Sequence, residues 1–396
     1  MNYKRINIYP IVAIFAVLCS TCITPFTPQG IEIEEGTVVI EGDIIVQGNT
    51  KVYISLLRSL EINRAPIKYI TEALVWVESN GGQIYNGSLV SDANVTPFFL
   101  IDTKELSFDQ LYKLCVSLPD GRRYESDFLT PFRTPEIEAI DFLVNDSKTA
   151  VDFFVTTYGA EPDQNSSQYY KWHYTEDWEI YAVHNTRVYF DINTIAVADF
   201  ETSPNPYYYC WKKSQSSSIM IAKTDHLKDN IVYQQKISSV DYRDDRISSL
   251  YFMDLSQMSI SKEAYLYWLN LKKITDEIGG IFAPQPSEMF GNIRCISHPD
   301  TKVIGYLSAG TVTSKTLFVP EQELGIYAPP KCELVTLEDF RLLTPYGLYL
   351  AGFRVVSTLL AHNINIYTVT WGSEDCVDCR SKGTKNKPSF WPNDHF

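Results

Sequence analysis

Short runs of alternating apolar and polar side chains fill the chain from residue 37 to residue 133. Clear examples are KVYISLL at Lys51–Leu57 and ALVWVE at Ala73–Glu78, each with the period of two that is typical of a half-buried strand. A third run begins at Tyr112 and is followed by Asp120-Gly121, a dipeptide that favours a tight hairpin turn. The pattern predicts an Ig-like antiparallel β-sandwich over residues 37–133.

A larger β-rich domain is predicted over residues 134–396. Its clearest strand is YYKWHYTEDWEIYAV, in which one side of the extended chain is almost entirely aromatic or aliphatic. Its one convincing helix runs near residues 262–278, with Ser259 or Ser261 as the N-cap and Gly279-Gly280 as the stop. The residues that recur at the helical period and form its expected buried stripe are Ala264, Trp268, Leu271, Ile274 and Ile278. The fold class predicted for the whole chain is mainly β.

Residues 1–21 have the pattern of an export signal. A positively charged start precedes an apolar segment, Ile6 to Leu18, that is too short to span a bilayer comfortably. The sequence LCSTC that ends at Cys22 resembles a relaxed lipobox, although Thr21 stands where a smaller residue is usual. We therefore expect lipidation of Cys22, with residues 22–36 as a tether. Ordinary signal cleavage and an uncleaved anchor helix are the alternatives.

Composition and charge narrow the possible functions. The formal net charge is −14 and no cluster of Lys and Arg is present, which argues against binding to nucleic acid or to anionic lipid headgroups. No later stretch is long and apolar enough for a transmembrane helix, so the expected membrane association is through the lipid anchor. The 396 residues, 45% of them hydrophobic, suffice for two domains with substantial cores.

The cysteines after Cys22 are even in number, which in an exported chain favours disulfides. Many pairings are open, so the sequence does not assign the connectivity. Alternation in the run from Tyr112 places Cys115 on the more polar face of its strand, and this thiol is the candidate for the odd one. The disulfide candidates are Cys210, Cys295, Cys332, Cys376 and Cys379.

The sharpest local motif is Cys376-Val377-Asp378-Cys379. Two thiols at this spacing form a redox pair, half of a zinc site, or two structural disulfides. Zinc requires a second pair of ligands, and none stands nearby in the sequence, although folding could bring in Cys332 or Cys295. The structural interpretation is favoured, and neither a metal nor a cofactor is expected.

No sequence motif supports catalysis. The nucleophile elbow, the P-loop, the dinucleotide fingerprint and HExxH are missing, and the histidines never stand at metal-ligand spacing. The pairs Glu176/Asp177 and Asp244/Asp245 have the residue types of a glycosidase acid and nucleophile, but such carboxylates are usually solvated charges on an acidic surface. The chain is therefore expected not to be an enzyme, and a carbohydrate-active enzyme is the least favoured alternative.

The end of the chain differs in charge from the rest. Residues 381–396 are basic and aromatic, whereas the whole chain is acidic. We hypothesise that this tail docks on a membrane partner through Arg380, Phe390 and Trp391.

Several stretches resemble the domain of unknown function 4249 family of Bacteroidetes outer-membrane lipoproteins, in order along nearly the whole chain after the signal. They are CITPF, VVIEGDI, the Asp120-Gly121 hairpin that ends in YES, Cys210-Trp211, EAYLYWLNLKK, GGIFAPQPSEMFGNI and VIGYLSAG. The closing CVDCRSKGTKNKPSFW resembles the family's C-terminal signature. Thr21 and the extra Cys295 depart from the family's pattern.

The resemblance implies a β-rich, surface-exposed lipoprotein of the outer membrane whose gene commonly lies beside that of a TonB-dependent transporter. By analogy of role with starch-utilisation D-type lipoproteins, it implies a non-enzymatic accessory that captures a ligand for this transporter. It implies no catalytic residue and no cofactor. A stand-alone surface binding or adhesion lipoprotein is the alternative, and the ligand is not identified.

Overall fold

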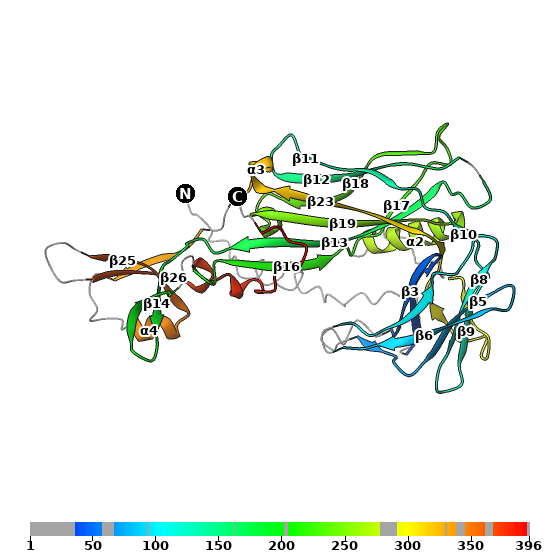
Figure 1. Cartoon of the computed structure of the whole chain (residues 1–396), viewed down its shortest axis with the longest axis horizontal. Helices are drawn as coiled ribbons and strands as arrows, with labels where there is room; N and C mark the ends of the chain where they lie inside the picture. Colours follow the sequence, from blue (N-terminus) through cyan, green and yellow to red (C-terminus); the bar gives the residue numbers. More distant parts are fainter. Residues whose placement is uncertain are drawn as a thin grey trace, which may run out of the picture.

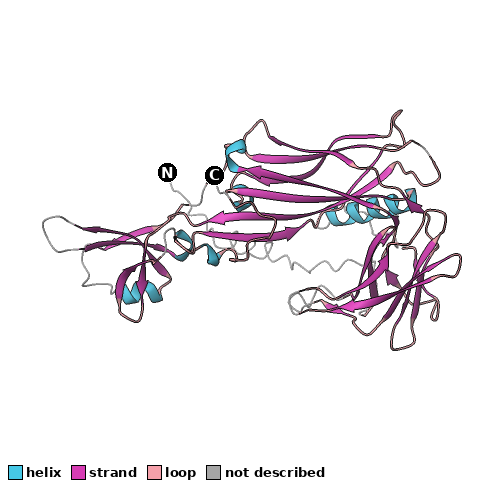
Figure 2. Cartoon of the chain, in the orientation of Figure 1, coloured by secondary structure: helices cyan, strands magenta, loops and turns pink. Residues whose placement is uncertain are grey.

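The structure, a computed structural model, describes residues 36–57, 67–92, 95–161, 163–201, 205–277, 291–328, 331–337, 345–360 and 367–393. Strands dominate these residues and form several sheets (Figures 1 and 2). The prediction of a mainly β protein is confirmed. Three units follow one another along the molecule: a first domain, a central domain of long strands and a small third unit (Figure 1). The expected signal segment and Cys22 lie outside the described residues.

The first domain consists of a ten-stranded sheet and a separate three-stranded sheet, β10-β22-β2, around one apolar core. Its strands are β1 (Val38–Gly42), β2 (Ile44–Ile45), β3 (Gly48–Leu56), β4 (Lys68–Tyr69), β5 (Leu74–Ser79), β6 (Ile84–Val90), β7 (Phe98–Thr103), β8 (Tyr112–Ser117), β9 (Arg123–Ser126), β10 (Pro131–Phe132), β20 (Ile293–Cys295), β21 (Val303–Ile304) and β22 (Ala309–Gly310). The main path of the ten-stranded sheet runs β20-β9-β8-β5-β6-β7-β3-β1-β21. Side chains alternate between core and surface, as in β5, where Val75 and Val77 are buried and Leu74 is exposed.

Three short strands of this domain come from far along the chain. β20 pairs with β9, β21 pairs with β1, and β22 lies between β2 and β10. Ile293 and Leu307 are buried in the same cluster as Ile40. The predicted boundary at residue 133 is therefore incomplete, because residues 291–310 return to the first domain. Strands of two or three residues are too short to show a period in the sequence.

The hairpin predicted from Asp120-Gly121 is formed by β8 and β9. Gly121 has a φ of 87°, a backbone conformation that glycine adopts without steric cost. Cys115 lies opposite Glu125 of β9 and Trp76 of β5 and is fully buried. The face predicted to be polar is thus covered by neighbouring long side chains at the position of Cys115.

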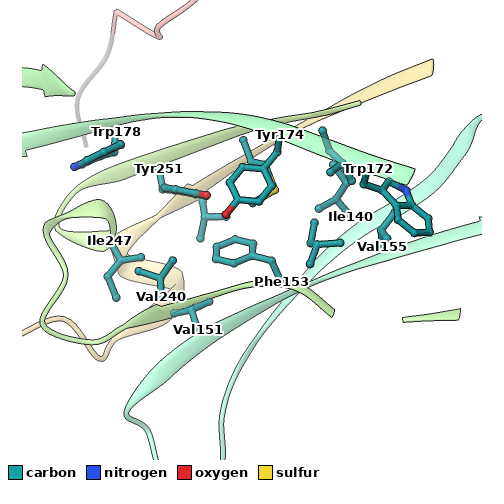
Figure 3. Close-up of a cluster of buried hydrophobic side chains, with 14 of the residues drawn as sticks. Ile140, Val151, Phe153, Val155, Trp172, Tyr174, Trp178, Val240, Ile247 and Tyr251 are labelled. Atoms are coloured by element: carbon teal, nitrogen blue, oxygen red, sulfur yellow. The ribbon is translucent and has the colours of Figure 1, made fainter. Parts of the chain in front are cut away.

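The central domain consists of two facing sheets. One contains β11 (Ile137–Val144), β12 (Ala150–Tyr158) and β18 (Ile231–Asp241), and the other contains β13 (Tyr169–Tyr181), β16 (Tyr209–Gln215), β17 (Met220–Lys223), β19 (Leu250–Ser259) and β23 (Val312–Pro320). A short helix, α3 (Glu321–Leu324), follows β23, and a 3-10 turn (Asp245–Ile247) precedes β19. Figure 3 shows side chains of both sheets meeting in the core, where the rings of Phe153 and Tyr251 are 5.1 Å apart. The predicted apolar side of β13, including Trp172 and Ile180, faces this core.

The predicted helix is α2 (Lys262–Glu277). Its N-cap is Ser261, whose Oγ accepts a hydrogen bond from the backbone N–H of Ala264 at 3.1 Å. Ser259, the alternative cap, belongs to β19 and is fully buried. The cap residue therefore marks the point where the chain leaves the central sheet and turns into the helix.

One side of α2 is buried between the first and central domains (Figure 1). Ala264 and Tyr267 are its buried residues, and the cluster around Ala264 includes Ile45 of the first domain. Leu271 is only half buried, and Ile278 lies outside the described residues. The predicted stripe is therefore buried chiefly in its N-terminal part, where α2 joins the two domains.

The third unit combines two separate parts of the chain. A hairpin of β14 (Val188–Asp191) and β15 (Ala196–Asp199) packs with β24 (Leu334–Leu337), β25 (Phe353–Leu360), β26 (Tyr367–Ser373) and helix α4 (Pro345–Leu350). Its core includes Phe190, Val355 and Trp371, and Trp371 is fully buried. The single larger domain expected from residue 134 onward thus contains two units with separate cores.

Candidate functional site

Two disulfides hold the last described part of the chain, which begins with two 3-10 turns (Glu374–Cys376 and Cys379–Ser381). Cys379 is bonded to Cys210 of β16, and Cys376 is bonded to Cys332, which precedes β24. The two cysteines of the CVDC motif therefore bind different partners instead of each other. The interpretation of the motif as a site of structural disulfides agrees with this connectivity. Among the described residues, no group of His, Cys, Asp or Glu is placed to hold a metal ion.

Cys295 is a free thiol, so its prediction as a disulfide candidate is wrong. Cys295 of β20 lies opposite Tyr124 of β9. The other free thiol, Cys115 of β8, lies opposite the next residue of β9, Glu125. Adjacent residues of a strand point to opposite faces of a sheet. The two thiols therefore lie on opposite sides of β9 and cannot form a bond with each other in the folded domain.

Both free thiols are expected to resist alkylation in the folded protein. Burial raises the pKa of the Cys115 thiol to about 12, so the reactive thiolate is scarce, and Cys295 is buried in the apolar core. Iodoacetamide treatment before and after unfolding in urea, followed by mass spectrometry of the two cysteine peptides, measures this. Labelling of Cys115 in the folded protein at the rate of an unfolded control would contradict the expectation.

Trp391 is buried against the outer face of the central sheet, where it packs with Trp211 and Phe252 and is only 3% exposed. Phe390, its neighbour, is half exposed, with its ring 4.4 Å from the ring of Phe252. Figure 1 shows the end of the chain running along the central sheet. Arg380 contacts an aromatic ring of its own chain. Trp391 therefore fills a small apolar core, whereas the side chain of Phe390 is accessible on the surface.

The guanidinium of Arg380 lies 3.5 Å from the ring centroid of Tyr207 and donates hydrogen bonds to both carboxylate oxygens of Asp378. The docking hypothesis is corrected for Trp391, because its side chain is inaccessible in the folded chain. Arg380 is already paired, which leaves Phe390 as the accessible docking candidate.

Truncation of the two neighbouring aromatic residues is expected to have very different effects. Trp391→Ala should lower the free energy of unfolding by about 3 to 5 kcal/mol, because it leaves a cavity beside Phe252. Phe390→Ala should lower it by about 1 kcal/mol or less, since this side chain is already half exposed. Urea titrations of both variants measure the difference. Equal losses would show that the tail does not pack as described.

The side chains of the acidic pair Glu176/Asp177 lie on opposite faces of the central sheet. Glu176 is buried, accepts a hydrogen bond from the Tyr251 hydroxyl at 2.8 Å and lies 3.4 Å from the guanidinium of Arg246. Asp177 is the next residue of β13 and points to the other face of the sheet, where burial raises its pKa. The two carboxylates therefore cannot act together on one bond.

The second pair, Asp244/Asp245, is also accounted for by structural contacts. Asp244 binds the guanidinium of Arg246 at 2.7 Å. Asp245 accepts hydrogen bonds from the Lys212 ammonium at 2.8 Å and from the Trp178 indole at 3.0 Å. These contacts stabilise the turn before β19 and its packing on β13.

A pocket of about 350 Å³ lies where the first domain meets the start of α2. It is lined by residues 127–130 and Phe132, by the first turn of α2, and by Asn292 and residues 306–309 of the returning segment. This site has no signal in the sequence, because its three segments are far apart in the chain and none contains a recognisable motif. The return of residues 291–310 to the first domain creates the pocket.

Buried hydrogen bonds fix the wall of the pocket. The side chain of Asn292 donates to the Leu307 carbonyl at 2.8 Å and accepts from the Leu307 N–H at 2.9 Å. The backbone carbonyl of Asn292 accepts a hydrogen bond from the backbone N–H of Asp127 at 2.8 Å. The N–H of Ser308 donates to the Asp43 carboxylate at 2.9 Å. The pocket is therefore largely pre-formed, as ligand sites usually are.

The electrostatic environment of the pocket is negative. Burial raises the pKa of Tyr306, and the carboxylates of Glu263 and Asp127 act in the same direction, while a hydrogen bond with Ser261 opposes them. Asp127 is partly neutralised by Arg294, whose guanidinium lies 3.2 Å away. The negative charges stand beside the aromatic rings of Tyr306 and Phe128. This arrangement combines an apolar surface with hydrogen-bond acceptors.

Comparisons with known proteins identify the family. No curated protein matches the chain. A family model described as a domain of unknown function, DUF4249, matches residues 23–316, a range that includes the first domain and the pocket and ends within β23. The closing CVDCRSKGTKNKPSFW stretch lies beyond the matched residues. No helix of the described residues is long and apolar enough to cross a membrane. The chain therefore belongs to the domain of unknown function 4249 family.

Proposed function

We propose that this protein is a non-enzymatic lipoprotein of the outer-membrane surface that captures a ligand for a TonB-dependent transporter. The lipid anchor is attached at Cys22, and residues 22–36 tether the folded part. Confinement beside a transporter raises the effective concentration of the captured ligand at the transporter entrance. Capture then requires only modest intrinsic affinity.

The pocket between the first domain and α2 is the observation that carries this proposal. Its volume of about 350 Å³ is at the lower end of the range of small-molecule sites, and its wall is fixed by hydrogen bonds of Asn292 and Ser308. Of the carboxylates considered for catalysis, those of Glu176, Asp244 and Asp245 are engaged in structural contacts, and Asp177 points to the opposite face of the sheet from Glu176. A binding function therefore agrees better with these residues than hydrolysis does.

The disulfides support the exported location in this proposal. Cys210–Cys379 and Cys332–Cys376 are of the kind that persists in oxidising compartments. They attach the tail to both the central domain and the third unit. A body tied together in this way suits a protein that stands outside the cell without a chaperone.

Quantitative co-purification from detergent-solubilised outer membranes tests the proposal. A tag inserted at Gly81-Gly82 avoids the disulfide-bonded tail, because this turn is exposed on the first domain. We expect a stoichiometric transporter to co-purify, and the Cys22→Ala variant to be lost from the membrane fraction. A Cys22→Ala variant that stays equally membrane-bound would overturn the anchor.

A matched pair of variants tests the remaining docking candidate. Phe390→Ala should reduce the recovered transporter, whereas Tyr233→Ala, which removes a more exposed aromatic side chain from β18, should not. Anchored protein that recovers no transporter would instead support the stand-alone binding or adhesion protein. Turnover of glycans by the purified protein would support the carbohydrate-active enzyme.

A further inference from the structure

We propose that the pocket between the first domain and α2 binds its ligand through a positively charged amine or guanidinium group attached to an apolar part. This inference rests on the proposed function, since it specifies the ligand class of the same pocket. It is carried by the hydrogen-bonding character of the lining, by one buried hydroxyl and by the position of the aromatic rings.

The charged side chains of the lining are all hydrogen-bond acceptors. Carboxylates of Asp127 and Glu263 line the pocket, together with hydroxyl groups, and no Lys, Arg or His side chain is among its described lining residues. The side-chain amide of Asn292 is already paired with Leu307. An ammonium group has three donors and no acceptor, and a guanidinium has five donors. Such groups complement this lining, whereas an anion does not.

Glu263 is the pocket carboxylate without an ion-pair partner among the described residues. No described residue forms an ion pair with its carboxylate, in contrast to Asp127, which Arg294 partly neutralises. Glu263 stands in the first turn of α2, where the helix contributes a partial positive charge of about half a unit. The full negative charge of Glu263 exceeds this contribution. The start of α2 is therefore not an anion site.

Ser308 supplies an independent indication of a missing partner. Its residue is 5% exposed and its Oγ has no hydrogen-bond partner among the described residues, although both of its backbone polar groups are paired. A buried hydroxyl without a partner is costly. A ligand ammonium that reaches this oxygen would donate to it and remove the cost.

Aromatic rings provide the apolar part of the site. Phe128, Phe132 and Tyr306 line the pocket, and Phe128 is 44% exposed. The ammonium of Lys113 already lies 5.2 Å from the centroid of the Phe128 ring, which is the geometry of a cation–π contact. Lys113 itself is held by Glu125 at 2.8 Å and does not line the pocket. A ligand cation has comparable aromatic partners beside the carboxylates.

The test uses full-length lipoprotein in neutral detergent and two small probes that differ in charge. Nα-acetyl-lysine amide carries the side-chain ammonium, and Nα-acetyl-norleucine amide has a similar apolar side chain without the ammonium. Ligand-observed NMR titration gives the apparent Kd of each. We expect the lysine probe to bind saturably and about tenfold more tightly than the norleucine probe, as for hydrogen bonds to a charged group.

Variants identify the site of binding. Glu263→Gln should weaken lysine-probe binding about tenfold and Ser308→Ala about threefold. Glu72→Gln removes an exposed carboxylate of the first domain that does not line the pocket and should leave binding unchanged. Unchanged circular dichroism of the variants shows that each one is folded.

Three outcomes would overturn the inference: no saturable binding of the lysine probe, equal binding of the norleucine probe, or equal binding by Glu263→Gln and the wild type. Tighter binding of a neutral sugar such as glucose would assign the pocket to saccharides instead. None of these results changes co-purification with a transporter. Failure of the ligand class is therefore distinguishable from failure of the proposed function.

Discussion

Replacing Cys210 and Cys379 together by alanine is expected to lower the free energy of unfolding of the central domain by about 4 to 5 kcal/mol. The disulfide joins residues separated by 169 positions, so its loss greatly increases the number of conformations of the unfolded chain. It also releases the tail from β16, exposing the side of the sheet that Trp391 covers. Hydrogen exchange of β16 amides during urea titration reports this domain alone.

The second disulfide provides the control. Replacing Cys332 and Cys376 by alanine opens a loop of only 44 positions and frees the attachment of the third unit. It should speed hydrogen exchange in β24 and β26 and leave β16 much less affected. Equal exchange of β16 in both double variants would contradict the assignment of Cys210–Cys379 to the central domain.

The Arg246→Met variant is expected to lose about 3 kcal/mol or more, the cost of leaving a buried charge without its partner. Glu176 is 4% exposed. Its carboxylate forms an ion pair with the Arg246 guanidinium and accepts a hydrogen bond from the Tyr251 hydroxyl. Removal of the guanidinium leaves a negative charge in the core shown in Figure 3. Urea unfolding followed by tryptophan fluorescence measures the loss, because Trp178 lies in this core.

The double variant Glu176→Gln/Arg246→Met separates the charge from the packing. Glutamine keeps an oxygen that accepts from Tyr251 but carries no charge. The double variant should therefore recover a large part of the stability lost in Arg246→Met. If the two losses instead add, the electrostatic explanation is wrong and the packing of the Arg246 side chain is responsible.

The elements that the sequence predicted well are those whose own residues contain the signal. β13 shows an apolar side over many residues, and α2 has both a helical period and a capping serine, Ser261. β20, β21 and β22 contain two or three residues each, so their place in the first domain depends on pairing with distant strands. Long-range pairing of this kind leaves no local pattern.

The candidate site shows the same limit. Cysteine positions indicated disulfides, but the buried position of Cys295 opposite Tyr124 follows only from the pairing of β20 with β9. The burial of Trp391 also depends on a distant surface, that of Phe252. The pocket has no sequence signal at all, because its carboxylates Asp127 and Glu263 become neighbours only in the folded chain.

The central position of β22 has a consequence for the order in which the molecule assembles. Ala309 pairs on one side with Ile44 and on the other with Pro131, so two early segments are joined through a late one. An amino-terminal portion of the chain that ends before residue 309 lacks this strand, so its first domain is completed only after residue 310 has been added. Until then its unpaired strand edges are open to aggregation.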